Sequence, residues 1–455
     1  MAGFKHDLTE GSVTRQLIRF SMPFLFSNFL QALYNLVDML VVSVFNGDIG
    51  VSAVSIGGQI TMLIMNIITG LATGVTVLVA QYIGAKQDKD RRQTTGTMAA
   101  LFLLIGVVIT IVMLFAGGPF LHLLQTPPDS FDSAKAYLDI SMLGTIFIFG
   151  YNAVSAVLRG MGDSKRPMYF VMIATVVNVI LDLVFVGPMG MGAAGAALAT
   201  IIAQALSFVL SVIYLIKKDF FAEFTLADFK FNWHKSSLLL RIGLPSAAQG
   251  VLVSISFLFL TMLVNSLDNP VIASACQGIG ARVNGFAILP GIAIASAISS
   301  MAGQNIGAGR HDRAKKTMWV GFGLIQAVTI IIFIFIQFFA EGIMNVFTST
   351  PETITVGAQY LRIIAGDFIL SGMVFALNSL AIAAGQTSFA FFNAILSSIL
   401  TRIPLAYLFA VVLGWGMPGI GWAITIAPIP SILFGLWYVR AGKWKKPSAA
   451  LVSPY

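Results

Sequence analysis

Long apolar stretches recur along almost the whole chain and constrain its fold more than any other feature. A helix needs about 20 residues to cross the hydrocarbon core of a bilayer. Twelve stretches have that character: 17–45, 51–82, 95–116, 136–158, 167–188, 192–216, 238–266, 271–305, 315–340, 356–384, 388–413 and 418–440. Short polar loops separate them. The sequence therefore predicts an all-α integral membrane protein with twelve transmembrane helices.

The composition excludes a water-soluble protein. Of the 455 residues, 57% are hydrophobic and only 10% carry a charge, and the mean hydropathy is +0.88. A soluble chain of this size needs far more charge to cover its surface. The apolar segments also lack the strict alternation of strands, and open strands leave backbone groups unsatisfied in lipid. Helices are therefore the expected way across the membrane.

The 27 Lys and Arg residues are concentrated on one side of the predicted topology. Runs at 86–92, 310–316 and 440–446 all fall on the side of the two termini. An excess of Lys and Arg marks cytoplasmic loops, so we expect a multi-pass protein of the inner membrane with both termini in the cytoplasm. The net charge of +8 then reflects topology and contacts with lipid headgroups, and we expect no nucleic acid partner.

Neither cysteine nor histidine forms a pattern typical of a metal centre or a disulfide framework. Cys276 is the single cysteine, and the four histidines are scattered over loops and span ends. Residues 160–163 spell Gly-Met-Gly-Asp, as in intramembrane aspartyl proteases. Basic residues surround this motif and place it in a cytoplasmic loop, away from the acids with which it would have to share a site. We therefore expect neither an enzyme nor a bound cofactor.

The two halves of the chain repeat each other at a nearly constant offset. Pro23 matches Pro245, and residues 81–85 match 304–308. Because each half holds an even number of spans, both copies have the same orientation, which is the plan of a parallel-repeat transporter. We expect two six-helix lobes. The expected limits are 1–216 for the N-terminal lobe, 217–236 for a cytoplasmic linker, 237–446 for the C-terminal lobe and 447–455 for a tail.

Two acidic residues lie inside predicted spans of the first half, where an ionisable group costs on the order of 3 kcal/mol at the bilayer centre. Asp38 lies in the first span and Asp182 in the fifth. Asn178 shares a helix face with Asp182, because the two are four residues apart, and Thr200 in the sixth span can point to the same place. Oxygen ligands beside carboxylates can hold a proton or a hard cation such as Na⁺. The alternative interpretation is that both acids only stabilise helix packing.

The second half carries charges of both signs at membrane depth. Arg282, Asp367 and Arg402 lie about half-way across spans eight, ten and eleven. Opposite charges in lipid imply pairing, so a structural salt bridge and a substrate site both fit this pattern, and breaking a pair should destabilise the protein. Pro23 and Pro245 each remove a backbone hydrogen bond inside a long helix. A hinge near the cation ligands and a static bend both fit their placement.

Several motifs resemble those of the multidrug and toxic compound extrusion (MATE) family of transporters. They are residues 31–38, 70–74, 81–85, 158–164 and 190–200, the last echoed at 416–425. The resemblance covers nearly the whole chain in order. It implies two six-helix lobes that enclose a central cleft, with alternating access driven by Na⁺ or H⁺ influx.

The resemblance also implies which residues bind the coupling ion in the N-terminal lobe, and it agrees with the interpretation from the residues alone. These ligands are Asp38, Asn178, Asp182 and Thr200, with Tyr34, Asn35 and Pro23 as possible support. One branch of the family has an acidic residue in span seven. In this chain that span has no acid, so a second cation site in the C-terminal lobe is not expected, and its Gln249 is a possible supporting or substrate-binding residue.

The expected function is export of drugs or other amphipathic or cationic organic compounds by an H⁺- or Na⁺-coupled antiporter. The implied partners are a small organic substrate, the coupling ion and membrane lipids, with a monomer as the default. The alternative is a lipid-linked oligosaccharide flippase or polysaccharide exporter of similar two-lobe plan. Its cavity should be strongly basic to bind pyrophosphate, and only Arg282 and Arg402 would serve here, one of which Asp367 can neutralise.

Overall fold

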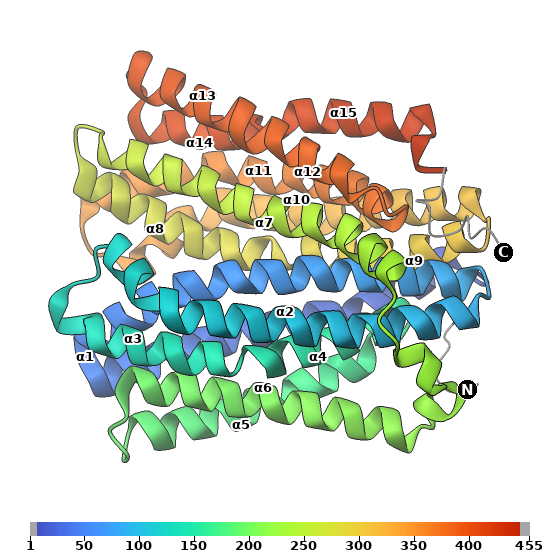
Figure 1. Cartoon of the computed structure of the whole chain (residues 1–455). Helices are drawn as coiled ribbons and strands as arrows, with labels where there is room; N and C mark the ends of the chain where they lie inside the picture. The colour runs from blue at the N-terminus through green and yellow to red at the C-terminus, as the bar shows by residue number, and fades with distance from the viewer. Residues whose placement is uncertain (1–6, 446–455) are drawn as a thin grey trace. The chain divides into compact units, whose positions relative to one another are not determined.

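The computed structural model describes residues 7–445, in which every regular element is a helix (Figure 1). The first half contains α1 (Val13–Gly84), α2 (Asp88–Leu123), α3 (Pro128–Leu143), α4 (Thr145–Gly160), α5 (Lys165–Val186) and α6 (Gly192–Lys217), followed by the short 3-10 helices η1 (Phe220–Glu223) and η2 (Leu226–Phe229). The second half contains α7 (Trp233–Asn265), α8 (Pro270–Ala287), α9 (Leu289–Gly307), α10 (His311–Phe347), α11 (Pro351–Ala383), α12 (Thr387–Ile395), η3 (Leu396–Arg402), α13 (Ile403–Tyr407), η4 (Leu408–Val412), α14 (Gly416–Ile426), α15 (Pro428–Ala441) and η5 (Lys443–Lys445). The predicted tail, 447–455, lies outside the described residues.

Ten helical segments of the described chain are long and apolar enough to cross a membrane, and the bent pair α3 and α4 makes an eleventh. The twelfth crossing lies within α1, which has 72 residues. That is about 108 Å of helix at 1.5 Å per residue, whereas a bilayer core is about 30 Å thick. Gly47 divides α1, because its backbone angles (φ 58°, ψ -154°) are not helical. The prediction of twelve transmembrane helices is therefore confirmed.

The helix bounds repeat between the two halves, as the matched motifs predicted. α2 begins at Asp88 and α10 at His311, and α3 begins at Pro128 and α11 at Pro351. Both pairs of starts are separated by the same offset. The copies differ locally, since α3 and α4 are bent by 45° where α11 is continuous. The counterpart of α5 is also interrupted, because η3 and η4 are π-helical turns on either side of α13.

The chain folds into two compact units whose limits differ from the halves of the repeat. Among the described residues, unit 1 contains Asp7 and 26–247, and unit 2 contains 8–25 and 248–445. α1 and α7 are therefore each shared between the units. The predicted linker, 217–236, lies inside unit 1 rather than between the units.

Small and apolar residues hold these shared helices within their units. In unit 1, a Cβ added to Gly70 would lie 2.3 Å from the backbone nitrogen of Ala247, so only glycine permits this approach of α1 to the first half of α7. In unit 2, the first half of α1 contributes Leu17, which is fully buried, to a core that also includes residues of α9, α10 and α15. α1 is thus packed on both sides of the point where it changes unit, and so is α7, because Leu260 and Val264 in its second half are buried in a core of unit 2.

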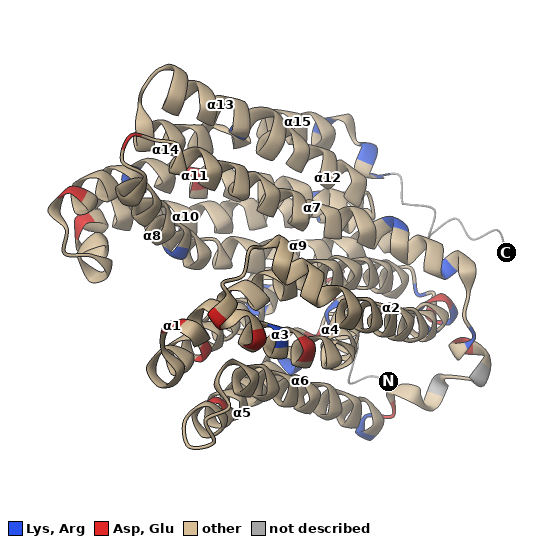
Figure 2. Ribbon diagram, turned by 60° about the vertical axis from the view of Figure 1, so that its left-hand side comes forward, with Lys and Arg blue, Asp and Glu red and all other residues tan. Residues whose placement is uncertain are grey.

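Basic residues gather at one end of the helices within each unit (Figure 2). In unit 1 this end carries the loop before α2 and the end of α6, and in unit 2 it carries the loop between α9 and α10. The start of the described chain and the C-terminal end of α15 also lie at this end of unit 2, where Leu8 and Trp444 share one core. The orientation of this end toward the cytoplasm stays a prediction.

Candidate functional site

The four predicted cation ligands lie together within unit 1. Asp38 comes from α1, Asn178 and Asp182 from α5, and Thr200 from α6. The Thr200 hydroxyl donates to Asp38 Oδ2 at 3.4 Å and accepts from Asn178 Nδ2 at 3.4 Å. Asp182 is fully buried, and its carboxyl group lies beside that of Asp38. Three helices thus bring two carboxylates, an amide and a hydroxyl to one place.

The local sequence explains why these polar groups are buried. The buried residues of α5 recur every three or four positions and so occupy one face, and Asn178 and Asp182 lie on that face. The opposing stretch of α6 consists of glycine and alanine up to Thr200 except for Leu198, which lets the two helices pack closely. The polar side chains are therefore held between helices instead of facing lipid.

Several buried oxygen atoms of the site accept no hydrogen bond. Asp38 Oδ1, Asn178 Oδ1 and both carboxylate oxygens of Asp182 are buried and have no hydrogen-bond partner among the described residues. Two neighbouring carboxylates repel when both are ionised, and a proton or a cation between them relieves this repulsion. No group of three or more His, Cys, Asp or Glu forms a metal site within residues 7–445. A Na⁺ ion here would use the mixed oxygen set of carboxylates, amide and hydroxyl, which suits a hard cation.

A small chamber of about 20 Å³ lies beside these ligands. This is room for about one water molecule. Asn178 and Thr200 form part of its wall, and Tyr34, which the sequence suggested as a supporting residue, forms another part. The remaining wall residues are Gln31, Val171, Ala174, Thr175, Ala203, Gln204 and Ser207. The chamber gives the predicted cation ligands a polar neighbourhood inside an apolar bundle.

Sequence reasoning missed three polar neighbours of the site. Gln31 and Gln204 line the chamber, and Tyr137 of α3 lies close enough to Asp38 and Asp182 to interact with them electrostatically. Gln204 follows Thr200 by four residues, so helical spacing could have placed it on the same face. Tyr137 gave no comparable signal, because only the packing of α3 brings it to the acids.

Three other residues that the sequence suggested as support lie elsewhere. Asn35 is exposed on α1. Pro23 lies in the part of α1 that belongs to unit 2, and Gln249 is half-buried in the part of α7 that belongs to unit 2. None of the three lines the chamber beside Thr200. Their suggested roles stay predictions.

The charged residues of unit 2 do not form the salt bridge that was one interpretation of the sequence. Asp367 of α11 accepts a hydrogen bond from Ser371 Oγ at 2.8 Å. Arg402, at the end of η3, is 6% exposed and lies over the ring of Phe257 at 5.0 Å. Asp367 and Arg402 interact electrostatically but do not contact each other, and Arg282 is exposed on α8. Asp367 and Arg402 therefore do not form a salt bridge, because Asp367 contacts Ser371 and Arg402 contacts the ring of Phe257.

Asp367 instead lines a cavity of about 410 Å³ that lies wholly within unit 2. This volume is in the range of sites for drug-sized ligands. The aromatic side chains of Phe257, Tyr360 and Phe368 form part of the wall, and the polar groups include Thr261 and Asn284. The cavity thus combines an apolar, aromatic surface with one carboxylate.

Comparison with known proteins identifies the family. The MatE family model matches residues 23–184 and again residues 245–408. The chain belongs to the MATE family of transporters. It is therefore a multi-pass membrane transporter, and the two matches confirm the internal repeat.

The relatives cover almost the whole chain. The probable multidrug resistance protein YpnP of Bacillus subtilis (strain 168) is 31% identical over 97% of this chain and 98% of its own length. The probable multidrug resistance protein NorM of Thermotoga maritima is 25% identical over 95% of this chain and 94% of its own. A solved structure described as an outward-facing conformation of a multidrug resistance MATE family transporter has a TM-score of 0.91 at 24% identity, covering 96% of this chain and 98% of that one. This last likeness confirms the fold.

Proposed function

We propose that the protein is a cation-coupled antiporter that exports drugs or other amphipathic or cationic organic compounds by alternating access, with H⁺ or Na⁺ as the coupling ion. The observation that carries the proposal is the pair of adjacent carboxylates, Asp38 and Asp182, at membrane depth with unsatisfied buried oxygens. An ionisable group inside a membrane protein marks a functional site by default. Relatives named as multidrug resistance proteins support the substrate class.

In the proposed cycle the coupling ion is itself transported and is not a resident cofactor. A proton or Na⁺ binds at Asp38, Asp182, Asn178 and Thr200, removes the repulsion between the carboxylates and lowers the cost of burying them. The neutralised site then favours a different packing of α1, α5 and α6. For a neutral substrate exchanged for one ion, moving one elementary charge through 100 mV supplies about 2.3 kcal/mol, enough for a roughly fiftyfold gradient at about 1.36 kcal/mol per tenfold. A monovalent cationic substrate exchanged for one ion moves no net charge, so the concentration gradient of the ion then drives export.

The cavity of unit 2 supports a cationic, amphipathic substrate. Its aromatic wall offers apolar contact, and the carboxylate of Asp367 offers a partner for a positive charge. A carrier of lipid pyrophosphate needs a basic cavity, and no Lys or Arg lines this one among the described residues. The cavity thus favours drug export over oligosaccharide export.

The test is substrate efflux from proteoliposomes under a Na⁺ gradient and a pH gradient, applied separately, with ethidium as the probe. Asp38→Asn should abolish gradient-driven efflux in the gradient that drives the wild type. Asp48→Asn is the matched control, because Asp48 is exposed beside the break at Gly47 and should transport normally. Unchanged efflux by a folded Asp38→Asn protein would refute the proposal.

A further inference from the structure

Arg402 places a buried guanidinium group inside unit 2. The residue is 6% exposed, and neither Nε nor Nη1 has a hydrogen-bond partner among the described residues. The guanidinium lies over the ring of Phe257 at 5.0 Å. A cation over an aromatic ring is held more weakly than a guanidinium that donates two N–H groups to a carboxylate. Arg402 would therefore be stabilised by a move toward an anionic acceptor.

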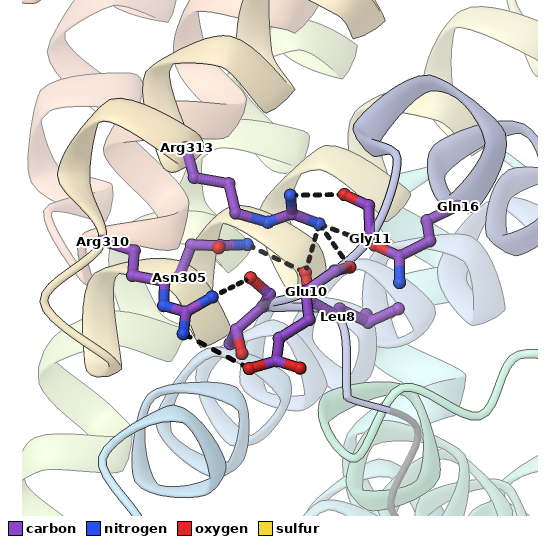
Figure 3. Close-up of polar contacts among 8 residues, drawn as sticks. Leu8, Glu10, Gly11, Gln16, Asn305, Arg310 and Arg313 are labelled. Atoms are coloured by element: carbon purple, nitrogen blue, oxygen red, sulfur yellow. Dashed lines mark hydrogen bonds and ion pairs between the residues drawn. The ribbon is translucent and has the colours of Figure 1, made fainter.

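Another arginine of the same unit has acceptors for both of its terminal nitrogens. Arg313 Nη1 donates to the carbonyl oxygen of Gly11 at 2.7 Å, and its Nη2 donates to that of Glu10 at 2.7 Å and to Gln16 Oε1 at 2.8 Å (Figure 3). Such bonds hold an arginine side chain in one place. Arg402 lies at membrane depth, where an ionised group without acceptors is costly.

The backbone that carries Arg402 departs from a regular α-helix. Arg402 ends η3, the π-helical turn Leu396–Arg402. Within this turn, the carbonyl oxygen of Ser398 accepts a hydrogen bond from Ser256 Oγ of α7 at 2.8 Å. Phe257, the next residue of α7, lies under the guanidinium. π-helical turns inside α-helices are frequent at functional sites, and this one packs Arg402 against α7.

The acid with which Arg402 interacts electrostatically is Asp367. The two do not form a salt bridge, and Asp367 accepts a hydrogen bond from Ser371 Oγ at 2.8 Å. Asp367 lines the cavity of about 410 Å³, and so do Phe257 and Tyr360. Tyr360 also interacts electrostatically with both charged groups. The guanidinium thus lies against the cavity wall at Phe257, while the carboxylate faces the cavity.

The carboxylate of Asp367 needs a counter-charge at every stage of transport. A cationic substrate in the cavity supplies that charge. After the substrate has left, Asp367 must bind a proton or another cation, because an unpaired charge at membrane depth is costly. No Lys or Arg lines the cavity among the described residues. Arg402, against the wall at Phe257, is placed to supply the missing charge.

We propose that Arg402 is a tethered competitor of the cationic substrate for Asp367. The position over Phe257, seen in the structure, leaves the carboxylate open to the substrate. When the substrate leaves, the guanidinium moves to Asp367 and donates its unpaired Nε and Nη1 groups to the carboxylate. This pairing opposes rebinding of the released substrate. The inference rests on the cationic substrate proposed for this cavity.

The first test is ethidium binding to the full-length protein. Arg402→Gln removes the competitor, so ethidium should bind roughly tenfold tighter, as expected if the paired state is populated about nine to one in the wild type. Ethidium efflux from proteoliposomes should slow, because the competitor no longer displaces the bound cation. The affinity for an uncharged analogue should stay within about twofold. A purely structural role of Arg402 predicts instead that both ligands bind more weakly.

Arg362→Gln is the matched control, because it removes the same charge from unit 2. Arg362 is on α11, the helix of Asp367, and its Nη2 contacts Glu341 Oε1 at 3.1 Å in an exposed ion pair. Exposed ion pairs contribute little to stability. Ethidium affinity and efflux of this variant should match those of the wild type.

The second test needs no change at Arg402 and measures its distance from Asp367 in the wild type. Arginine is labelled with ¹⁵N in the guanidinium and aspartate with ¹³C in the side-chain carboxyl, and solid-state NMR of proteoliposomes compares the ¹⁵N–¹³C distances with and without ethidium. Ion pairs such as Arg166 with Asp163 give a constant background. An additional short distance should appear without ethidium, and it should be absent with ethidium and in Asp367→Asn.

An unchanged ethidium affinity in folded Arg402→Gln, or identical ¹⁵N–¹³C distances with and without ethidium, would overturn the inference and leave the proposed function standing. Wild-type ethidium affinity in Asp367→Asn would show that the carboxylate does not bind the substrate. In that case the cationic substrate proposed for this cavity fails together with the inference. The behaviour of Asp367→Asn therefore distinguishes the two failures.

Discussion

Replacing Thr200 by valine should separate Na⁺ coupling from H⁺ coupling, because the two ions predict effects of opposite sign. The change removes the hydroxyl that donates to Asp38 Oδ2 and accepts from Asn178, and it keeps the shape of the side chain. A hydrogen bond to a charged group contributes about 1.5 to 3 kcal/mol. At 3.4 Å this bond is long, so about 1.5 kcal/mol, roughly tenfold in an equilibrium constant, is the expected size.

For Na⁺ coupling, the hydroxyl oxygen is one of few ligands, so Thr200→Val should weaken Na⁺ binding roughly tenfold. For H⁺ coupling, the hydroxyl stabilises the ionised carboxylate, so its loss should make proton binding tighter by a similar factor. The assay is the Na⁺ dependence and the pH dependence of ethidium efflux from proteoliposomes. Thr175→Val is the control, because Thr175 lines the same chamber, whereas the hydrogen bond to Asp38 Oδ2 comes from Thr200. Unchanged Na⁺ and pH midpoints in Thr200→Val would refute the assignment of Thr200 as a ligand.

Three further predictions concern packing, the linker and the cavity. Gly70→Ala should destabilise unit 1 by about 1 to 3 kcal/mol, since the new Cβ would overlap the Ala247 backbone; Gly58→Ala, with nothing within 4 Å, should leave the thermal unfolding midpoint in detergent unchanged. The Thr225 backbone N–H and the Arg92 guanidinium hold the pKa of Asp228 below its usual range, so the contact of the linker with α2 through Asp228 is complete above that range and is lost as pH falls through the lowered pKa. At pH 7, Asp228→Asn should therefore speed proteolysis of the linker, and cleavage at the rate of the wild type would contradict this. Asp367→Asn should weaken ethidium binding and spare the binding of an uncharged analogue, and equal loss of both would argue against a charge contact in the cavity.

The number and order of the transmembrane helices could be predicted from the sequence, but their ends and breaks could not. Hydropathy marks the apolar window, whereas the helix continues into polar flanks, so the stretch predicted at 315–340 became α10, His311–Phe347. The break at Gly47 could be predicted, because it lies in the short stretch between the apolar segments 17–45 and 51–82. The π-helical turn that ends at Arg402 had only Pro404 as a local signal.

The grouping of Asp38, Asn178, Asp182 and Thr200 could be predicted because each is a polar residue at a similar depth in an apolar helix. The sharing of α1 and α7 between units could not. A repeat shows that two segments are equivalent, but it does not show which unit each half of a helix packs against. That choice depends on close contacts such as Gly70 with Ala247, which are distant in sequence.

The repeat also shows which residues of the second half stand at the positions of Asp38 and Asp182. The offset between Pro23 and Pro245 places Asp38 opposite Leu260, and the offset between the starts of α5 and α12 places Asp182 opposite Pro404. Both carboxylates are thus replaced by uncharged residues. Asp367 and Arg402 stand at positions where the first half has Gly144 and Ile180, so they are not displaced copies of the predicted cation ligands. One copy of the repeat thus carries the two acids and the other carries the aromatic cavity. This difference is expected if unit 1 binds the coupling ion and unit 2 contributes the surface that binds the substrate.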